Sequence, residues 1–120
     1  MSNFSFEKLE VYQKAVLFTN RVYSISKTWP REYLFDLTNQ IRRASLSISL
    51  NIAEGTSRSS KDFSRFIDMA RGSCFECAAL IEIATAQKLI NQSVKDELIG
   101  ELVLLSKMLS GLKKSINQKP

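Results

Sequence analysis

The sequence predicts an all-α protein: an antiparallel, up-down-up-down four-helix bundle formed by one domain over residues 1–120. Three observations lead to this prediction. Apolar residues recur three and four positions apart in four segments, which is the period of an amphipathic helix, and no segment alternates as a strand does. Turn-forming residues separate the segments. The connections are short, so consecutive helices are expected to pack antiparallel. We expect helices at about residues 7–27, 31–54, 61–89 and 94–116.

The first two predicted helices meet at a proline. An apolar face runs along residues 7–27 and stops at Trp29-Pro30, because a residue before proline avoids helical geometry and proline suits a first helical turn. The second helix then continues to Glu54, and Gly55 is the expected residue just beyond its end.

Capping patterns mark the third and fourth helices. Ser59 and Asp62 have the spacing of a capping box, which indicates a helix start. Asn91 can close that helix, and Ser93 with Asp96 repeats the pattern for the last one. The fourth helix carries an apolar seam with alternating spacings of four and three, typical of helix packing in bundles: Leu98, Leu102, Leu105, Leu109, Leu112 and Ile116.

The second helix carries two apolar stripes on nearly opposite sides. One, expected in the core, contains Leu34, Leu37, Ile41, Ser45, Ile48 and Ile52. The other contains Phe35, Leu46, Leu50 and Ala53. A monomeric bundle needs one apolar face, so the second stripe predicts a homo-oligomer interface. A central helix that contacts its neighbours over a wide arc is the alternative.

Composition limits the classes of function. The 120 residues carry a net charge of +5, which favours anionic partners. No apolar run approaches the roughly 20 residues of a membrane span, and the first residues lack a signal-peptide pattern. We therefore expect a cytoplasmic protein with no membrane partner.

The residues that most catalytic sites require are missing. The chain has no histidine, which excludes Ser-His-Asp catalysis, imidazole zinc sites and di-iron bundle sites. Cys74 and Cys77 form a C-x-x-C in mid-helix, where core packing is the better interpretation. The loop at residues 55–60 lacks the second glycine and the lysine of a P-loop. We predict no enzyme activity, no catalytic residue, no cofactor and no metal.

Two groups of polar residues are candidates for interaction or structure. Five cations are candidate nucleic-acid contacts: Arg42, Arg58, Arg65, Lys113 and Lys114. For the three arginines a solvated face is the equal alternative, and for the two lysines a solvated helix end is the preferred one. A second group is interpreted as a structural polar seam: Arg43, Asn51, Glu54 and Glu76. In this interpretation Arg43 pairs with Glu76 or Glu54, and Asn51 and Glu54 satisfy backbone groups near the end of the helix.

Several blocks of this sequence resemble one bacterial family. The most specific are Gln40-Ile41-Arg42-Arg43-Ala44, Asn51-Ile52-Ala53-Glu54-Gly55, Phe63-x-Arg65-Phe66 and Ala70-x-Gly72-Ser73-x-x-Glu76. Together they are similar to the "four helix bundle protein" family, also called 23S rRNA-intervening sequence proteins. The resemblance implies a ring-like homopentamer. It also implies a relation to the accessory protein of diversity-generating retroelements, which works with nucleic acid and a reverse transcriptase. It supplies no catalytic residues.

The chain departs from the family pattern in two places. Ser49 and Leu50 stand where relatives often have a helix-kinking proline before the asparagine, and Cys74 to Cys77 replaces a hydrophobic-Glu-Leu segment. From residues and resemblance together, we expect a non-catalytic, homo-oligomeric accessory protein that binds RNA or DNA. The alternative is a structural or protein–protein adaptor without nucleic-acid binding.

Overall fold

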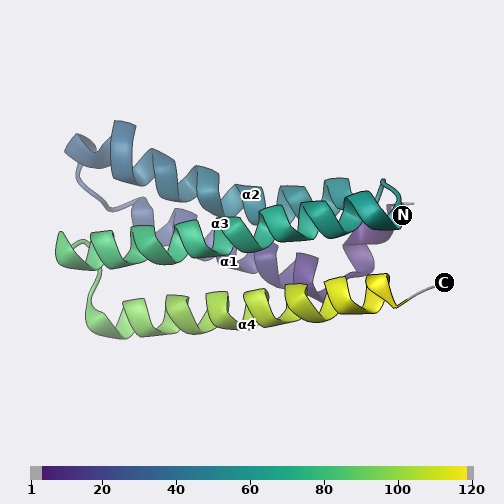
Figure 1. The fold of residues 1–120 in the computed structure, drawn as a ribbon. Helices are drawn as coiled ribbons and strands as arrows, with labels where there is room; N and C mark the ends of the chain where they lie inside the picture. The colour runs from purple at the N-terminus through teal and green to yellow at the C-terminus, as the bar shows by residue number, and fades with distance from the viewer. Residues whose placement is uncertain (1–3, 119–120) are drawn as a thin grey trace.

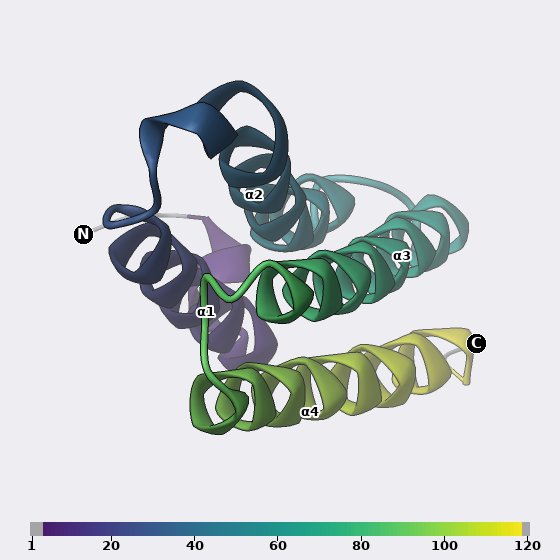
Figure 2. The same ribbon diagram turned by 90° about the vertical axis from the view of Figure 1, so that its left-hand side faces the viewer.

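The computed structural model describes residues 4–118, and within them it contains helices and no strand. The four long helices are α1 (Glu10–Ser26), α2 (Asn39–Gly55), α3 (Ser60–Ala86) and α4 (Gln92–Asn117). They lie side by side and alternate in direction, so the start of α1, the α2–α3 loop and the end of α4 share one end of the bundle (Figure 1). An end-on view shows the four helices around a common core (Figure 2). The predicted all-α four-helix bundle is confirmed.

The predicted apolar faces form most of the core. Five of the six α4 seam residues are buried, and Leu112 is half-buried against them. In α1 the buried face is centred on Ala15 and Phe18, whereas Tyr23 is exposed. A short 3-10 turn, η1 (Ser5–Lys8), precedes α1 at the position where the predicted helix began.

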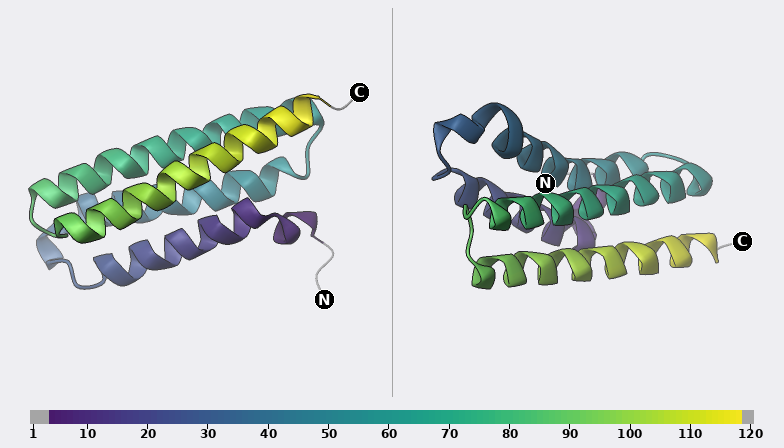
Figure 3. Two further views of the ribbon diagram at one scale, coloured as in Figure 1. Left: turned by 90° about the horizontal axis from the view of Figure 1, so that it is seen from below. Right: turned by 60° about the vertical axis from the view of Figure 1, so that its left-hand side comes forward.

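The second predicted helix is not regular over its whole length. Residues 31–38 form a 3-10 turn, η2 (Arg31–Tyr33), and a π turn, η3 (Leu34–Thr38), before α2 begins. This segment rises away from α3 at one end of the bundle (Figure 3). A π turn closes i→i+5 hydrogen bonds and shifts the residues before it relative to the helix that follows. Leu34, predicted in the core, is therefore 38% exposed.

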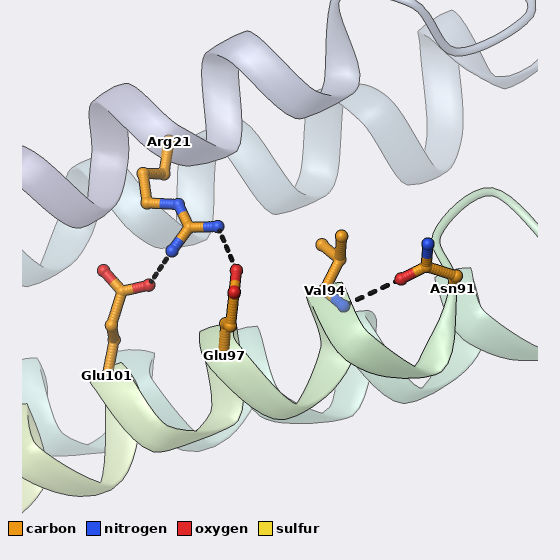
Figure 4. Close-up of polar contacts among 5 residues, drawn as sticks. All are labelled: Arg21, Asn91, Val94, Glu97 and Glu101. Carbon is orange, nitrogen blue, oxygen red and sulfur yellow. Dashed lines mark hydrogen bonds and ion pairs between the residues drawn. The ribbon is translucent and has the colours of Figure 1, made fainter.

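Helix ends follow side-chain caps. Ser59 Oγ accepts a hydrogen bond from the Asp62 N–H at 3.3 Å, as the capping pattern predicts. The cap of α4 is Asn91, whose Oδ1 accepts from the Val94 N–H at 2.8 Å (Figure 4). The prediction that Ser93 and Asp96 cap this helix was wrong by two residues, because asparagine is at least as good an N-cap as serine.

The third helix ends at Ala86, three residues before the predicted end. Lys88 adopts a left-handed conformation with φ of 62°. Its N–H donates to the Thr85 carbonyl, and the Leu89 N–H donates to the Ala84 carbonyl. These two bonds are those of a Schellman motif, which usually has glycine at this position. Asn91 was expected to close this helix, but Lys88 does so.

Lys88→Gly is expected to stabilise the chain by about 1 kcal/mol, because a side chain in the left-handed region carries a steric penalty that glycine lacks. Thermal unfolding followed by circular dichroism measures the effect as a raised midpoint. Lys95→Gly, in the regular part of α4, is expected to lower the midpoint instead. A fall in both variants would contradict the strain at Lys88.

A forked contact joins α1 to α4. Arg21 donates one bond to Glu97 at 2.9 Å and another to Glu101 at 2.7 Å (Figure 4). The hydrogen bond to Glu97, with the charges of both carboxylates, raises the pKa of Arg21 above its usual value. All three side chains are partly exposed, so the contact fixes the register of the two helices more than it adds stability.

Candidate functional site

The second apolar stripe of the sequence lies on the outside of the molecule. Phe35 is 86% exposed and Leu50 is 61% exposed, while Leu46 and Ala53 are half-buried. We call these four residues the outer face of α2. Positions 46, 50 and 53 follow each other at helical spacing, and Phe35 precedes them on the π turn. At its far end, Ala53 shares a hollow of about 410 Å³ with Phe4 and Phe6, so the apolar surface continues onto the first residues of the described chain.

The five predicted nucleic-acid contacts do not form one cluster. Arg42 lies near the start of α2, and Arg58 lies in the loop beyond its end. The part of α2 between Arg42 and Gly55 separates these two positions by about 20 Å at 1.5 Å per residue. Arg65, Lys113 and Lys114 belong to the same end of the bundle as Arg58 (Figure 1). The structure therefore splits the set into four cations at the α2–α3 loop end and Arg42 at the other end.

Three of the four cations at the loop end have carboxylate partners. Arg58 contacts Glu54 at 3.0 Å and lies over the ring of Phe66. The other pairs are Arg65 with Asp62 at 3.6 Å and Lys113 with Asp68 at 2.8 Å. Lys114 is exposed and has no ion pair among residues 4–118. Exposed pairs of this kind contribute only about 0–1 kcal/mol each, so a phosphate can replace the carboxylate with little loss of stability.

Arg42 is held by α1. Its Nε donates to the Ser26 Oγ at 2.8 Å, and its guanidinium lies 4.7 Å from the centre of the Tyr23 ring. It lines a hollow of about 440 Å³ together with Lys27 and Arg31. Sequence reasoning listed Arg42 among the candidate nucleic-acid contacts, but the helical wheel does not show what the preceding helix brings beside it.

A polar seam runs between α2 and α3, but only part of it was predicted. Asn51 Nδ2 donates to the Ser47 carbonyl at 2.8 Å and to the Ser47 Oγ at 3.0 Å, and the Ser73 Oγ donates to the Ser47 Oγ at 2.9 Å. Gln40 Nε2 donates to Glu76 at 2.6 Å. Gln40 and Ser73 belong to the motifs quoted above, and membership of those motifs was the available signal for them.

Arg43 does not make the predicted ion pair with Glu76 or Glu54. Glu76 accepts from Gln40, one turn earlier on α2, and Glu54 contacts Arg58. Arg43 is exposed and shares a hollow with Gln40 and Glu76 without bonding to that carboxylate. Glu54 is three turns further along the same helix, beyond the reach of Arg43. The expectation that Glu54 satisfies a backbone group was also wrong, since its side chain accepts from Arg58.

The two cysteines are buried in the core, and both are free thiols. Burial raises the pKa of Cys74 to about 11 and raises the pKa of Cys77 further above its usual value. Raised pKa values keep both thiols protonated at neutral pH, and the thiolate is the nucleophile and metal ligand. The C-x-x-C therefore acts as core packing.

We expect both thiols to resist a thiol reagent at pH 8 in the native chain and to react at once in denaturant, at a rate at least tenfold higher. Stability should also fall as pH rises above about 9, because the unfolded chain then ionises its thiols while the folded chain keeps its protons. The absorbance of the chromophore that the reagent releases measures the reaction rate. Urea unfolding at several pH values measures the change in stability. Equal reaction rates in the two states would contradict the buried placement.

Other binding chemistry has little support in the described part of the chain. Residues 4–118 contain no group of three or more potential metal ligands. No helix among them combines the length and the apolar character that a membrane crossing requires.

The described chain is thus a helical bundle with an exposed apolar face, surface cations and buried thiols. The chain belongs to the 23S rRNA-intervening sequence protein family, whose model matches residues 7–111. It is also similar to a crystal structure of a protein of unknown function from the S23 ribosomal protein family of Bacteroides thetaiotaomicron. The TM-score is 0.80 at 24% identity, over 87% of this chain and 95% of that one. At this identity the likeness supports the fold alone. A search of curated proteins finds no match.

Proposed function

We propose that this chain is the non-catalytic subunit of a homo-oligomer that assembles through the outer face of α2 and binds nucleic acid on the assembled surface. The main observation behind this proposal is the exposure of that face: Phe35 is 86% exposed and Leu50 is 61% exposed. Burying such side chains stabilises by about 1.5–3 kcal/mol each. A partner that covers the face gains this contribution, and a second copy offers the same apolar chemistry.

A ring of five copies is the assembly we propose, as the family resemblance implies. A closed ring covers the face on every subunit and leaves no copy with an open end. The α2 helix of this chain is continuous from Asn39 to Gly55. Ser49 and Leu50 stand in it where relatives often have a helix-kinking proline. Subunit angles in the ring then follow from a regular α2.

Assembly would strengthen the binding of nucleic acid to the cations at the loop end. One chain carries +5, and three of its four loop-end cations already have carboxylate neighbours. A closed oligomer repeats this end around its axis, so several weak phosphate contacts act together. Binding of this kind rests on counterion release and reads the backbone and not the sequence. RNA is our preferred partner, in keeping with the family description, and a reverse transcriptase remains a proposed protein partner.

Charge reversal at the loop end tests the nucleic-acid part of the proposal. We expect the wild type to bind RNA and duplex DNA at about 50 mM salt and to lose most of its affinity by about 200 mM. Arg58→Glu with Arg65→Glu should weaken binding at least tenfold for all sequences alike. Lys88→Glu, an exposed cation at the opposite end, is the control and should have a smaller effect. Filter binding or fluorescence anisotropy measures all three proteins.

An adaptor role is the alternative, and one hollow favours it. An apolar hollow of about 290 Å³ between α3 and α4 is lined by Phe75, Ile99 and Val103, among others, and Phe75 is 67% exposed. If the oligomer forms but binds neither RNA nor DNA at the lowest salt, the nucleic-acid part of the proposal is wrong and the adaptor role takes its place.

A further inference from the structure

The hollow beside Arg42 has a composition unlike the rest of the surface. It lies at the corner where the end of α1, the segment 27–38 and the start of α2 meet, in the region that rises away from α3 (Figures 2 and 3). Three cations line it: Lys27, Arg31 and Arg42. No carboxylate lines it, whereas at the loop end each of three cations has a carboxylate within 4 Å.

Arg42 is oriented before any ligand arrives. Its Nε is bonded to Ser26 and its plane lies against Tyr23, so the side chain has already lost much of its freedom. No acceptor within residues 4–118 bonds its two terminal amino groups. A guanidinium held in this way is suited to bidentate contact with an oxyanion.

Trp29 adds an independent observation. This side chain lines the same hollow, and its indole N–H is buried without an acceptor among the described residues. A buried donor without a partner is unfavourable, and Trp29 is the residue of this hollow that carries one. The dipole of α1 presents its negative end nearby, which favours Lys27 but falls off within one turn and leaves both arginines without a counter-charge.

We propose that this hollow binds a terminal phosphate group, that is, a phosphomonoester. Three cations without a carboxylate beside them suit a dianion better than a monoanion. A phosphomonoester carries about −1.5 to −2 near neutral pH, while a backbone diester carries about −1. The volume of about 440 Å³ is that of a small-molecule site, so it admits more than the phosphate alone. The ligand is either a small sugar phosphate or nucleotide, or the 5′-phosphate end of a strand.

This site is separate from the nucleic-acid surface proposed above. The loop-end cations are about 20 Å away along α2, and a phosphomonoester needs neither those cations nor an oligomer. The Arg58→Glu, Arg65→Glu protein should therefore keep this site, and loss of RNA binding in that protein would leave the present proposal intact.

The only tryptophan of the chain is Trp29, so intrinsic fluorescence reports on this hollow. We expect glycerol phosphate to change the emission with saturation, and dimethyl phosphate, a diester, to bind at least tenfold more weakly at equal ionic strength. Arg42→Gln should weaken glycerol phosphate binding at least tenfold. Arg43→Gln removes the same charge from the next residue, which lies outside the hollow, and should bind as the wild type does.

A second variant and a second measurement distinguish loss of binding from loss of folding. Arg31 is exposed on a short turn, so Arg31→Gln should fold normally and also weaken binding. Glycerol phosphate should raise the thermal midpoint of the wild type and of Arg43→Gln but not of Arg42→Gln. A short RNA with a 5′-phosphate, compared with the same RNA bearing a 5′-hydroxyl and with a nucleoside monophosphate, distinguishes the two sources. No saturable signal in the wild type, equal binding of the diester, or equal loss in Arg43→Gln would overturn the proposal.

Discussion

Gly55→Ala is expected to destabilise the folded chain by about 1–3 kcal/mol, the range for overpacking a well-packed core. Gly55 is the last residue of α2 and is buried. It does not adopt a left-handed conformation, because none of the described glycines has a positive φ. A Cβ at this position would lie 2.7 Å from the Phe63 Cδ1 and 2.9 Å from the Phe66 Cβ. A ring can turn, but a Cβ is fixed to its backbone, so α3 itself would have to move away from α2.

The matched control is Gly111→Ala. Gly111 lies within α4, and an added Cβ there would meet no atom within 4 Å. Alanine should stabilise the chain at this position by about 0.5–1 kcal/mol, since glycine is a poor helix former. Urea unfolding with an unchanged slope measures both effects as shifts of the midpoint in opposite directions. A Gly55→Ala midpoint equal to that of the wild type would show that the α2–α3 contact is looser than described.

Leu50→Asp is expected to dissociate the oligomer while leaving the subunit folded. Leu50 is 61% exposed in the single chain, so a charge there disturbs the core little. In an interface the same change removes about 1.5–3 kcal/mol of apolar burial and adds a desolvated charge without a partner. Each contact should therefore weaken at least tenfold, and the effect is repeated at every interface of a ring.

Leu17→Asp is the control for this prediction. Leu17 is 62% exposed on α1, so the two substitutions change the same residue type at the same exposure on different faces. Sedimentation velocity at matched concentrations should show slower-sedimenting species for Leu50→Asp and an unchanged assembly for Leu17→Asp. The reverse result would place the interface on α1 and not on α2.

The fold follows from local patterns because the signals of a bundle are local. The α4 seam and the Ser59 cap need only residues close in sequence, and both are confirmed. The sequence does not reveal the π turn before α2 or the left-handed Lys88, because neither has its usual signature residue. The N-cap of α4 was assigned to Ser93 instead of Asn91 because both residues are good caps and lie two positions apart.

The candidate site was less predictable because several of its side-chain contacts form between different helices. A helical wheel places Arg42 and Arg43 on their own helix but cannot show that α1 brings Ser26 and Tyr23 to Arg42. For the same reason, the helical wheel could not show that Glu76 accepts a hydrogen bond from Gln40 and not from Arg43. The outer face of α2 was predictable from the period of a single helix, and two of its four residues, Phe35 and Leu50, are exposed.

The central claim is that this chain assembles with copies of itself, and its mass in solution tests that claim most directly. Sedimentation equilibrium of the wild type at micromolar concentration should give a mass close to five times the 13.6 kDa of one chain. That mass should stay constant over a tenfold dilution, as a closed ring requires. A mass of one chain at every concentration would contradict the account and leave the outer face of α2 without a second copy to cover it.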